Sequence, residues 1–265
     1  MPATVAWISI APVKGMRMQE LTEVELGPEG AAGDRQFFIV DEQQAMVSAT
    51  RLGSLLGIVP DYRPGPGGGQ LALILPDGSR VSGQVELGEP EDITFFTVPQ
   101  RARPVLGEFS EAISEHCGTD LRLMARPDDR PGVDRGEYGP ATLLGVGSIG
   151  RLETEAAAAG QPGEIDRRRF RMNFGIEGIE PHEEDRWMNH RVGIGAAEVE
   201  VKERVGRCAA TTRDPDRGDV DLKTLHYIKA YRGDSDSPEP LPFGVYATVQ
   251  RPGLIRLGDP VTVAG

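Results

Sequence analysis

The chain has 265 residues, of which 38% are hydrophobic and 26% are charged, and its formal net charge is −12 at pH 7. Its length allows one large or two ordinary domains with well-filled cores. The acidic balance argues against a nucleic-acid binder, which needs a basic surface to neutralise phosphates. Residues 1–15 lack the pattern of a signal or transit peptide, and no apolar run is long enough to cross a bilayer. We therefore expect a cytoplasmic protein that binds neither nucleic acid nor membrane.

The first hundred residues are rich in predicted strands. Short apolar or alternating runs recur there between Gly, Pro and Asp clusters, a spacing typical of an antiparallel barrel or sandwich. These runs span residues 5–13, 21–28, 35–42, 70–78, 80–87 and 92–98. We expect a mainly β fold of the α+β class, with a few short helices.

The expected helices lie at residues 110–118, after the Gly-rich turn within residues 143–160, and within residues 219–232. The first two segments end at Gly118 and Gly160, which favour helix termination there. Ser148 lies near the start of the second helix, where a hydroxyl and free backbone N–H groups form a natural seat for phosphate.

Cys208 is one of only two cysteines, and its sequence setting favours chemistry. It follows an alternating, strand-like run and precedes a turn rich in Asp, Pro and Gly. Arg204, Arg207 and Arg213 lie close to it in sequence, and nearby cations favour the thiolate, which is both a nucleophile and a metal ligand. A free cysteine is also commonly a small buried hydrophobe, so both interpretations stand on these residues alone. Cys117, within a predicted helix, is interpreted as structural.

A second cluster of interest is basic. Arg167, Arg168, Arg169 and Arg171 lie within five positions, which in an acidic protein indicates a local anion site. The alternative is a solvated face whose arginines pair with acidic neighbours. The four histidines show no metal-ligand spacing.

Six sequence runs, taken together and in order, resemble the MOSC family, the molybdenum cofactor sulfurase C-terminal domain. The similar branch carries an N-terminal β-barrel region and includes the mitochondrial amidoxime reducing component. The runs are residues 11–15, 33–42, 143–153, 169–178, 206–218 and 253–261. The resemblance implies a MOSC-type β-barrel core at residues 123–265, packed against an N-terminal β-barrel region at residues 1–122.

The resemblance also implies a site for the molybdenum cofactor, a molybdopterin that carries a terminal phosphate. Cys208 matches the cysteine that ligates molybdenum in relatives, and the adjacent Arg207 and backbone of Gly206 match cofactor contacts. The residues that match the phosphate end and its surroundings are Lys14, Arg35, Ser148, Arg171 and Asn173. Gly15 replaces a serine of close relatives and retains only the backbone N–H, and Met172 replaces a common proline, so these departures leave the substrate open.

These matches predict a molybdenum-dependent oxidoreductase that reduces N-hydroxylated or other N-oxygenated small molecules. A sulfur carrier or cofactor-handling protein that uses a Cys208 persulfide is the alternative, because MOSC domains are also fused to sulfurases. A metal-free binding module is a third possibility. No four-cysteine ferredoxin spacing is visible, and the turn at Gly145–Gly147 lacks the continuation of a dinucleotide fingerprint. We therefore expect a separate electron-donor protein that docks near Arg167–Arg169.

Overall fold

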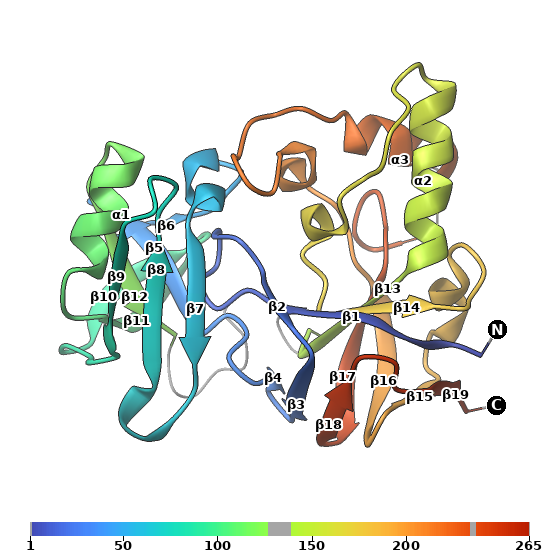
Figure 1. Ribbon diagram of the computed structural model, residues 1–265, viewed down its shortest axis with the longest axis horizontal. Helices are drawn as coiled ribbons and strands as arrows, with labels where there is room; N and C mark the ends of the chain where they lie inside the picture. Colours follow the sequence, from blue (N-terminus) through green and yellow to red (C-terminus); the bar gives the residue numbers. More distant parts are fainter. Residues whose placement is uncertain (1, 127–138, 234–236, 265) are drawn as a thin grey trace.

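The computed structural model describes residues 2–126, 139–233 and 237–264, and it is mainly β, as predicted. One lobe carries α1 (Phe109–Cys117) with strands β5 to β12, and the other carries α2 (Val146–Ala158), α3 (Thr224–Arg232) and strands β13 to β19 (Figure 1). Within the described residues, no helix is long and apolar enough to cross a membrane.

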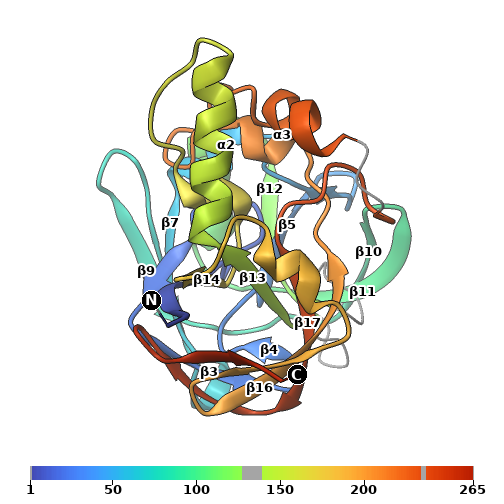
Figure 2. The ribbon, with the colours of Figure 1, turned by 90° about the vertical axis from the view of Figure 1, so that its right-hand side faces the viewer.

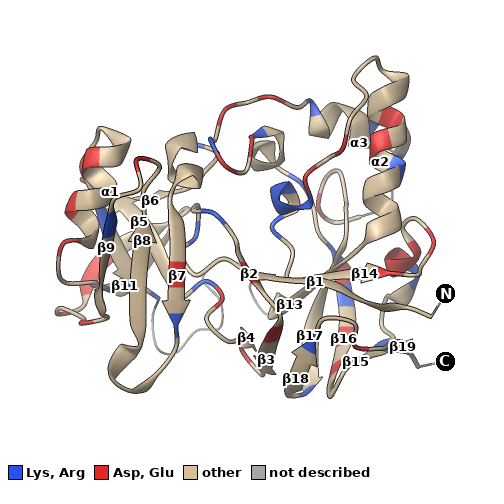
Figure 3. Ribbon diagram, viewed as in Figure 1, with Lys and Arg blue, Asp and Glu red and all other residues tan. Residues whose placement is uncertain are grey.

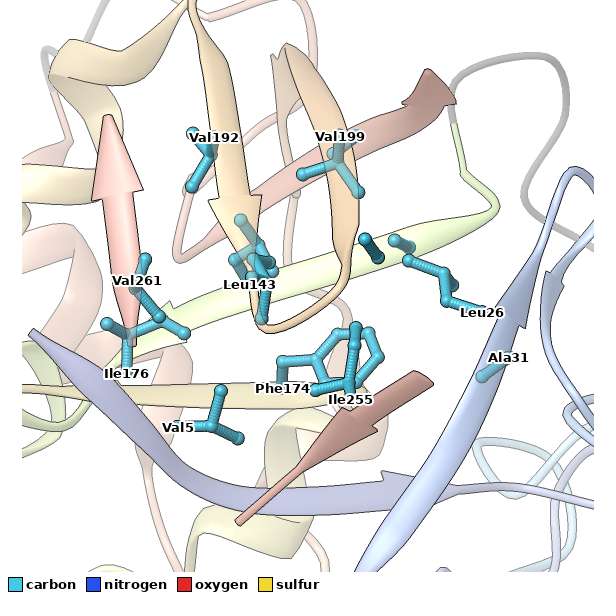
Figure 4. Close-up of a cluster of buried hydrophobic side chains, with 14 of the residues drawn as sticks. Val5, Leu26, Ala31, Leu143, Phe174, Ile176, Val192, Val199, Ile255 and Val261 are labelled. Atoms are coloured by element: carbon cyan, nitrogen blue, oxygen red, sulfur yellow. The ribbon is translucent and has the colours of Figure 1, made fainter. Parts of the chain in front are cut away.

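The largest sheet has eight strands in the order β19-β15-β16-β17-β13-β14-β1-β2. In chain order these are β1 (Thr4–Ile10), β2 (Gln19–Leu21), β13 (Ala141–Gly145), β14 (Phe174–Glu177), β15 (Arg191–Ile194), β16 (Ala197–Arg204), β17 (Val245–Arg251) and β19 (Val261–Val263). Strands β13 and β14 pair in parallel, and α2 lies in the crossover between them. Alternate residues of β16 are fully buried, as the alternating sequence predicts. Figure 4 shows how side chains from separate strands, such as Val5, Phe174 and Val199, gather into one core.

Three smaller sheets complete the fold. A five-stranded sheet has the order β10-β11-β12-β5-β6, and three-stranded sheets have the orders β7-β8-β9 and β18-β3-β4. Their strands are β3 (Glu23–Gly27), β4 (Gly30–Ala31), β5 (Phe37–Asp41), β6 (Met46–Val47), β7 (Val59–Arg63), β8 (Gln70–Ile74), β9 (Arg80–Gln84), β10 (Glu91–Phe95), β11 (Val98–Pro104), β12 (Leu121–Ala125) and β18 (Gly253–Arg256). The β18-β3-β4 sheet packs into the core of the large sheet through Leu26 and Ile255. A separate apolar cluster, which includes Ile39, Leu73 and Leu123, forms the core of the lobe that carries α1.

The strand pairing crosses the expected domain boundary. Strand β1 joins the large sheet by pairing with β14, and Leu26 in β3 lies opposite Gly253 in β18. In the other direction, β12 extends past residue 122 and pairs with β5. The two lobes are therefore interlocked, and the division at residues 122 and 123 stays a prediction.

The helices form where the sequence indicates, with shifted starts. Helix α1 buries Phe109 and Ile113, one turn apart, and ends at Gly118, whose φ of 67° is left-handed. Helix α2 begins at Val146 with Gly145 as its N-cap, so Ser148 lies inside its first turn. Figure 2 shows α2 and α3 next to each other above the large sheet, and the two helices are in contact.

Candidate functional site

A cavity of about 230 Å³ lies between the two lobes and is lined by segments of both. The N-terminal lobe contributes Lys14, Gly15, Arg35, Ser48, Ala49, Thr50 and Phe96. The other lobe contributes Arg169, Phe170, Arg171, Val205, Gly206, Arg207, Cys208, Ala210, Thr211 and Tyr246. A larger hollow of about 860 Å³, next to α2, is lined in part by Glu153, Glu164, Asp166 and Glu177 and holds none of the predicted site residues. The first cavity unites seven of the nine predicted site residues.

The walls of this cavity are cationic. Its lining residues include Lys14, Arg35, Arg169, Arg171 and Arg207, and the part of the chain that the structure describes contributes no Asp or Glu to the lining. The whole chain carries a net charge of −12, so the cavity departs in sign from the molecule around it. The basic turn η3 (Arg167–Phe170) lies between the lobes in Figure 3. Such a cluster of cations favours an anionic ligand.

Cys208 lies at the cavity wall with an exposed, free thiol. It directly precedes the short turn η5 (Ala209–Thr212), and its Sγ is 3.9 Å from Oγ1 of Thr50 in the opposite lobe. The interpretation of Cys208 as a small buried hydrophobe is therefore wrong. Cys117 differs, because it is half-buried in the N-terminal lobe, where burial raises the pKa of its thiol.

The two residues before Cys208 are fixed by backbone hydrogen bonds. The N–H of Gly206 donates to Oε2 of Glu239 at 2.5 Å, and the N–H of Arg207 donates to the carbonyl of Pro240 at 3.1 Å. A Cβ on Gly206 would lie 2.5 Å from Cβ of Glu239, so only glycine fits there. Because Glu239 accepts from Gly206, this N–H is engaged inside the protein.

The arginines next to Cys208 in sequence point toward other groups. Nε of Arg207 donates to the carbonyl of Phe243 at 2.8 Å, and its Nη1 donates to the carbonyl of Phe170 at 2.9 Å. The Arg213 guanidinium donates to the carbonyls of Gly218 and Thr50, at 2.7 and 2.9 Å. Arg213 therefore ties the η5 segment to the loop that carries Thr50, across the junction of the lobes.

Arg35 and Arg171 both adopt left-handed backbone conformations, with φ of 48° and 53°. Non-glycine residues in this region are uncommon, and strain of this kind concentrates at functional sites. Arg35 is 5% exposed, forms an ion pair with Asp34, and donates from Nη2 to the carbonyl of Arg171 at 3.4 Å. Arg171 donates from Nη1 to the carbonyl of Met16 at 2.7 Å. These contacts hold both cations at the cavity wall.

Comparisons with known proteins match both halves of the chain. The MOSC N-terminal beta barrel domain matches residues 2–120, and the MOSC domain matches residues 140–262. The mouse mitochondrial amidoxime-reducing component 1 (Mus musculus) is 36% identical over 297 residues, covering 99% of this chain and 82% of that protein. The chain belongs to the MOSC family. The human components 1 and 2 (Homo sapiens) are 30% and 26% identical, over 99% and 97% of this chain and 83% and 82% of their own lengths.

Asn173 does not line the cavity of this MOSC protein. It is fully buried, and its side chain accepts from Oγ1 of Thr142 at 2.8 Å and donates to Oδ2 of Asp34 at 3.0 Å. Asp34 in turn pairs with Arg35 and accepts from the N–H of Ala11 at 2.6 Å. Asn173 therefore holds Asp34, which in turn pairs with Arg35 at the cavity wall. The sequence analysis did not single out Asp34.

Ser148 also lies outside the cavity, and the phosphate seat expected at the start of α2 is already filled. Its Oγ donates to Oε1 of Glu184 at 2.8 Å and accepts from the N–H of His182 at 2.8 Å. Glu184 accepts from the N–H of Gly145 at 3.2 Å as well, and it is fully buried. Burial raises the pKa of Glu184. A carboxyl group of the protein itself thus occupies the helix N-terminus that would suit an anion.

The arginine cluster of η3 is divided between two roles. Arg167 pairs with Glu20 at 2.6 Å, and Arg168 pairs with Asp166 at 2.5 Å and with Asp216 at 2.8 Å. Arg169 is buried, lines the cavity and pairs with Asp221. The expected basic docking patch at Arg167–Arg169 is therefore matched by acidic partners, as the alternative interpretation of this cluster predicts.

In the described part of the chain, no three or more His, Cys, Asp or Glu residues come together in a way that could hold a metal ion. Cys208 and the cavity cations are thus the protein groups to test against the molybdenum cofactor. They suit it, because a soft thiol and a cluster of cations of the kind that phosphate favours line the same cavity.

Proposed function

We propose that this MOSC protein binds the molybdenum cofactor in the cavity between its lobes and reduces N-hydroxylated or other N-oxygenated small molecules. The observation that carries the proposal is the joint presence of an exposed thiol and five basic side chains around one cavity. Two of these side chains, Arg35 and Arg169, also pair with Asp34 and Asp221. The names of the relatives, which describe amidoxime reduction, support the reaction class. The residues for which we propose cofactor contact are Lys14, Gly15, Arg35, Arg171, Gly206, Arg207 and Cys208.

In this proposal each group has a distinct task. Lys14, Arg35 and Arg171 hold the phosphate end through charge-assisted hydrogen bonds, which are roughly twice as strong as neutral ones. Cys208 serves as the protein ligand to molybdenum through its thiolate. Gly206 and Arg207 shape the wall next to that ligand, and Asn173 and Asp34 keep Arg35 in place.

The bound molybdenum centre supplies the two-electron chemistry that removes oxygen from an N–O bond. The chain itself binds and orients the reactants. The exposed Sγ of Cys208 and the hydroxyl of Thr50, 3.9 Å apart, mark the open end of the cavity where a small molecule can approach. No acid–base residue of the chain is assigned to the reaction.

The proposal includes a separate electron-donor protein, because the reduction consumes two electrons. Its docking surface is not assigned to Arg167–Arg169, whose charges are matched by acidic partners. The relatives are named as mitochondrial proteins, and the cytoplasmic location of this chain stays a prediction.

The exposure of Cys208 also favours the second function, a sulfur carrier or cofactor-handling protein. A persulfide carrier needs a thiol that a partner enzyme can reach, and Cys208 is exposed and free. The cationic cavity favours a protein that binds the cofactor over a carrier of sulfur alone, because sulfur transfer by itself requires no phosphate site.

The experiment that tests the proposal uses protein purified from a host that makes the cofactor. We expect reduction of an N-hydroxylated amidine with reduced viologen as donor, in proportion to bound molybdenum, and no turnover with NADH alone. Robust NADH-driven turnover by the single chain would contradict the need for a separate donor. Metal-free protein that carries sulfane sulfur on Cys208 would replace the oxidoreductase with the sulfur carrier.

A further inference from the structure

Phe96 occupies a backbone position that suits other residues better. Strands β10 and β11 pair with Phe95 opposite Val98, so Phe96 and Thr97 form a two-residue hairpin turn. The φ of Phe96 is 54°, in the left-handed region. Hairpin turns with such a conformation favour Gly, Asn or Asp, and a bulky residue there is a strained exception. Local folding preference therefore does not explain the phenylalanine.

Burial does not explain it either. The side chain of Phe96 is 59% exposed, the second-largest exposure among the exposed large hydrophobic residues of the described chain. Exposed aromatic side chains in strained positions point to function more than to folding. Because Phe96 is both strained and exposed, we expect its side chain to contact a ligand or a partner.

The ring lies at the cavity that contains Cys208. Phe96 lines this cavity together with Thr50, whose hydroxyl is 3.9 Å from Sγ of Cys208. Its ring packs edge-on against Phe95, with centroids 5.2 Å apart, and Nζ of Lys14 lies 5.1 Å from its centroid. These two contacts hold the ring in place while most of its surface stays open to solvent.

We infer that Phe96 is a specificity-determining residue, an aromatic wall against which the flat, apolar body of an N-oxygenated substrate packs. The inference rests on the proposed function and names the substrate class, which is aromatic. The cations of the cavity suit an anion and offer little to a neutral organic body. Phe96 offers that body a large aromatic surface, and rings favour stacked or edge-to-face contact with other rings.

The test replaces Phe96 with asparagine, which suits the left-handed turn. We expect the melting temperature to rise or stay level and the molybdenum content to stay unchanged. The ratio of kcat/KM for an N-hydroxylated aromatic amidine to kcat/KM for hydroxylamine should fall roughly 3- to 10-fold, the loss expected for one aromatic contact. Phe96→Tyr should keep the ratio. Val98→Thr, at an exposed position of the same hairpin outside the cavity, is the matched control.

An unchanged ratio in Phe96→Asn would overturn the inference. Loss of molybdenum without a change in the ratio would also overturn it, because Phe96 would then act only by holding Lys14. The dissociation constant of the aromatic compound, measured by equilibrium dialysis, gives a second readout that needs no turnover. If wild-type protein reduces nothing yet binds this compound more tightly than Phe96→Asn, the proposed reaction fails and the aromatic wall stands. Equal binding by the two proteins would contradict the wall.

Discussion

Two regions of this protein are suited to an anion, and only one of them is open. The cavity between the lobes presents Lys14, Arg35 and Arg171 toward a space without a lining carboxylate among the described residues. The N-terminus of α2 presents Ser148 and backbone N–H groups, but Glu184 already accepts hydrogen bonds there. Hydrogen-bond donors and positive charge are therefore not sufficient to define a ligand site. The space that they face must also hold no carboxylate of the protein itself, such as Glu184 at the start of α2.

The substitution Cys208→Ser should have the largest effect. The change removes the proposed sulfur ligand from the open cavity, so we expect activity to vanish and the absorption of the bound metal to change. Cys117→Ser is the matched control, because Cys117 is half-buried away from the cavity. Activity assays and absorption spectra of the two variants are the measurements. Equal losses would show that Cys208 has no special role.

Removal of two cavity cations should have the next largest effect. In the double variant Arg35→Ala and Arg171→Ala, cofactor occupancy should fall at least tenfold, because each hydrogen bond to a charged group contributes about 1.5–3 kcal/mol. Molybdenum and pterin content of the folded protein is the measurement. Arg101→Ala, at an exposed arginine outside the cavity, should keep full occupancy. Full occupancy in the double variant would place the phosphate elsewhere.

His182 contacts Ser148 at the start of α2 and should make the free energy of unfolding depend on pH. Burial, with the charges of Arg232 and Arg151, lowers the pKa of His182 from 6.5 to about 3. The unfolded chain therefore binds a proton before the folded chain does, and the free energy of unfolding should fall as pH drops from 6.5 toward 3. His182→Asn keeps a residue that tolerates the left-handed φ of 60° and should flatten this dependence.

Urea unfolding at a series of pH values across this range measures how His182 changes the free energy of unfolding. The matched control is His190→Asn, at an exposed loop position, which should leave the slope as in the wild type. A wild-type slope in His182→Asn would show that other groups carry the acid sensitivity.

The smallest effect on the cofactor should come from Ser148→Ala. The change removes a buried donor to Glu184, so we expect a destabilisation of about 1–3 kcal/mol with unchanged molybdenum content. Unfolding curves and metal analysis of the same preparation separate the two effects. A drop in occupancy comparable to that of the arginine variants would return Ser148 to the cofactor site.

Much of the fold was predictable because its signals are local. The helix that ends at Gly118 and the alternating strand β16 follow from periodicity and from one glycine. The interlocked strands were not predictable this way. Strand β3 pairs with β18 more than two hundred residues later, and nothing in either short run specifies its partner.

The candidate site was likewise predictable only in part, because some of its contacts join residues that are distant in sequence. The setting of Cys208 and the resemblance to the MOSC family, which added Lys14 and Arg35, indicated residues that the structure unites in one cavity. The sequence could not indicate that Glu184 fills the start of α2, because this contact links residues 36 positions apart. The roles of Asp34 and Phe96 were missed for related reasons. The bond between Asp34 and Asn173 spans 139 positions, and Phe96 becomes notable only when its φ and its exposure are known.

The most direct test of cofactor binding in this cavity is the molybdenum and pterin content of the wild-type chain purified from a host that makes the cofactor. Stoichiometric molybdenum together with pterin phosphate is the predicted result, because the cationic cavity and Cys208 face one space. Cofactor-free protein, from cells whose other molybdenum enzymes are fully loaded, would show that this cavity does not bind the cofactor.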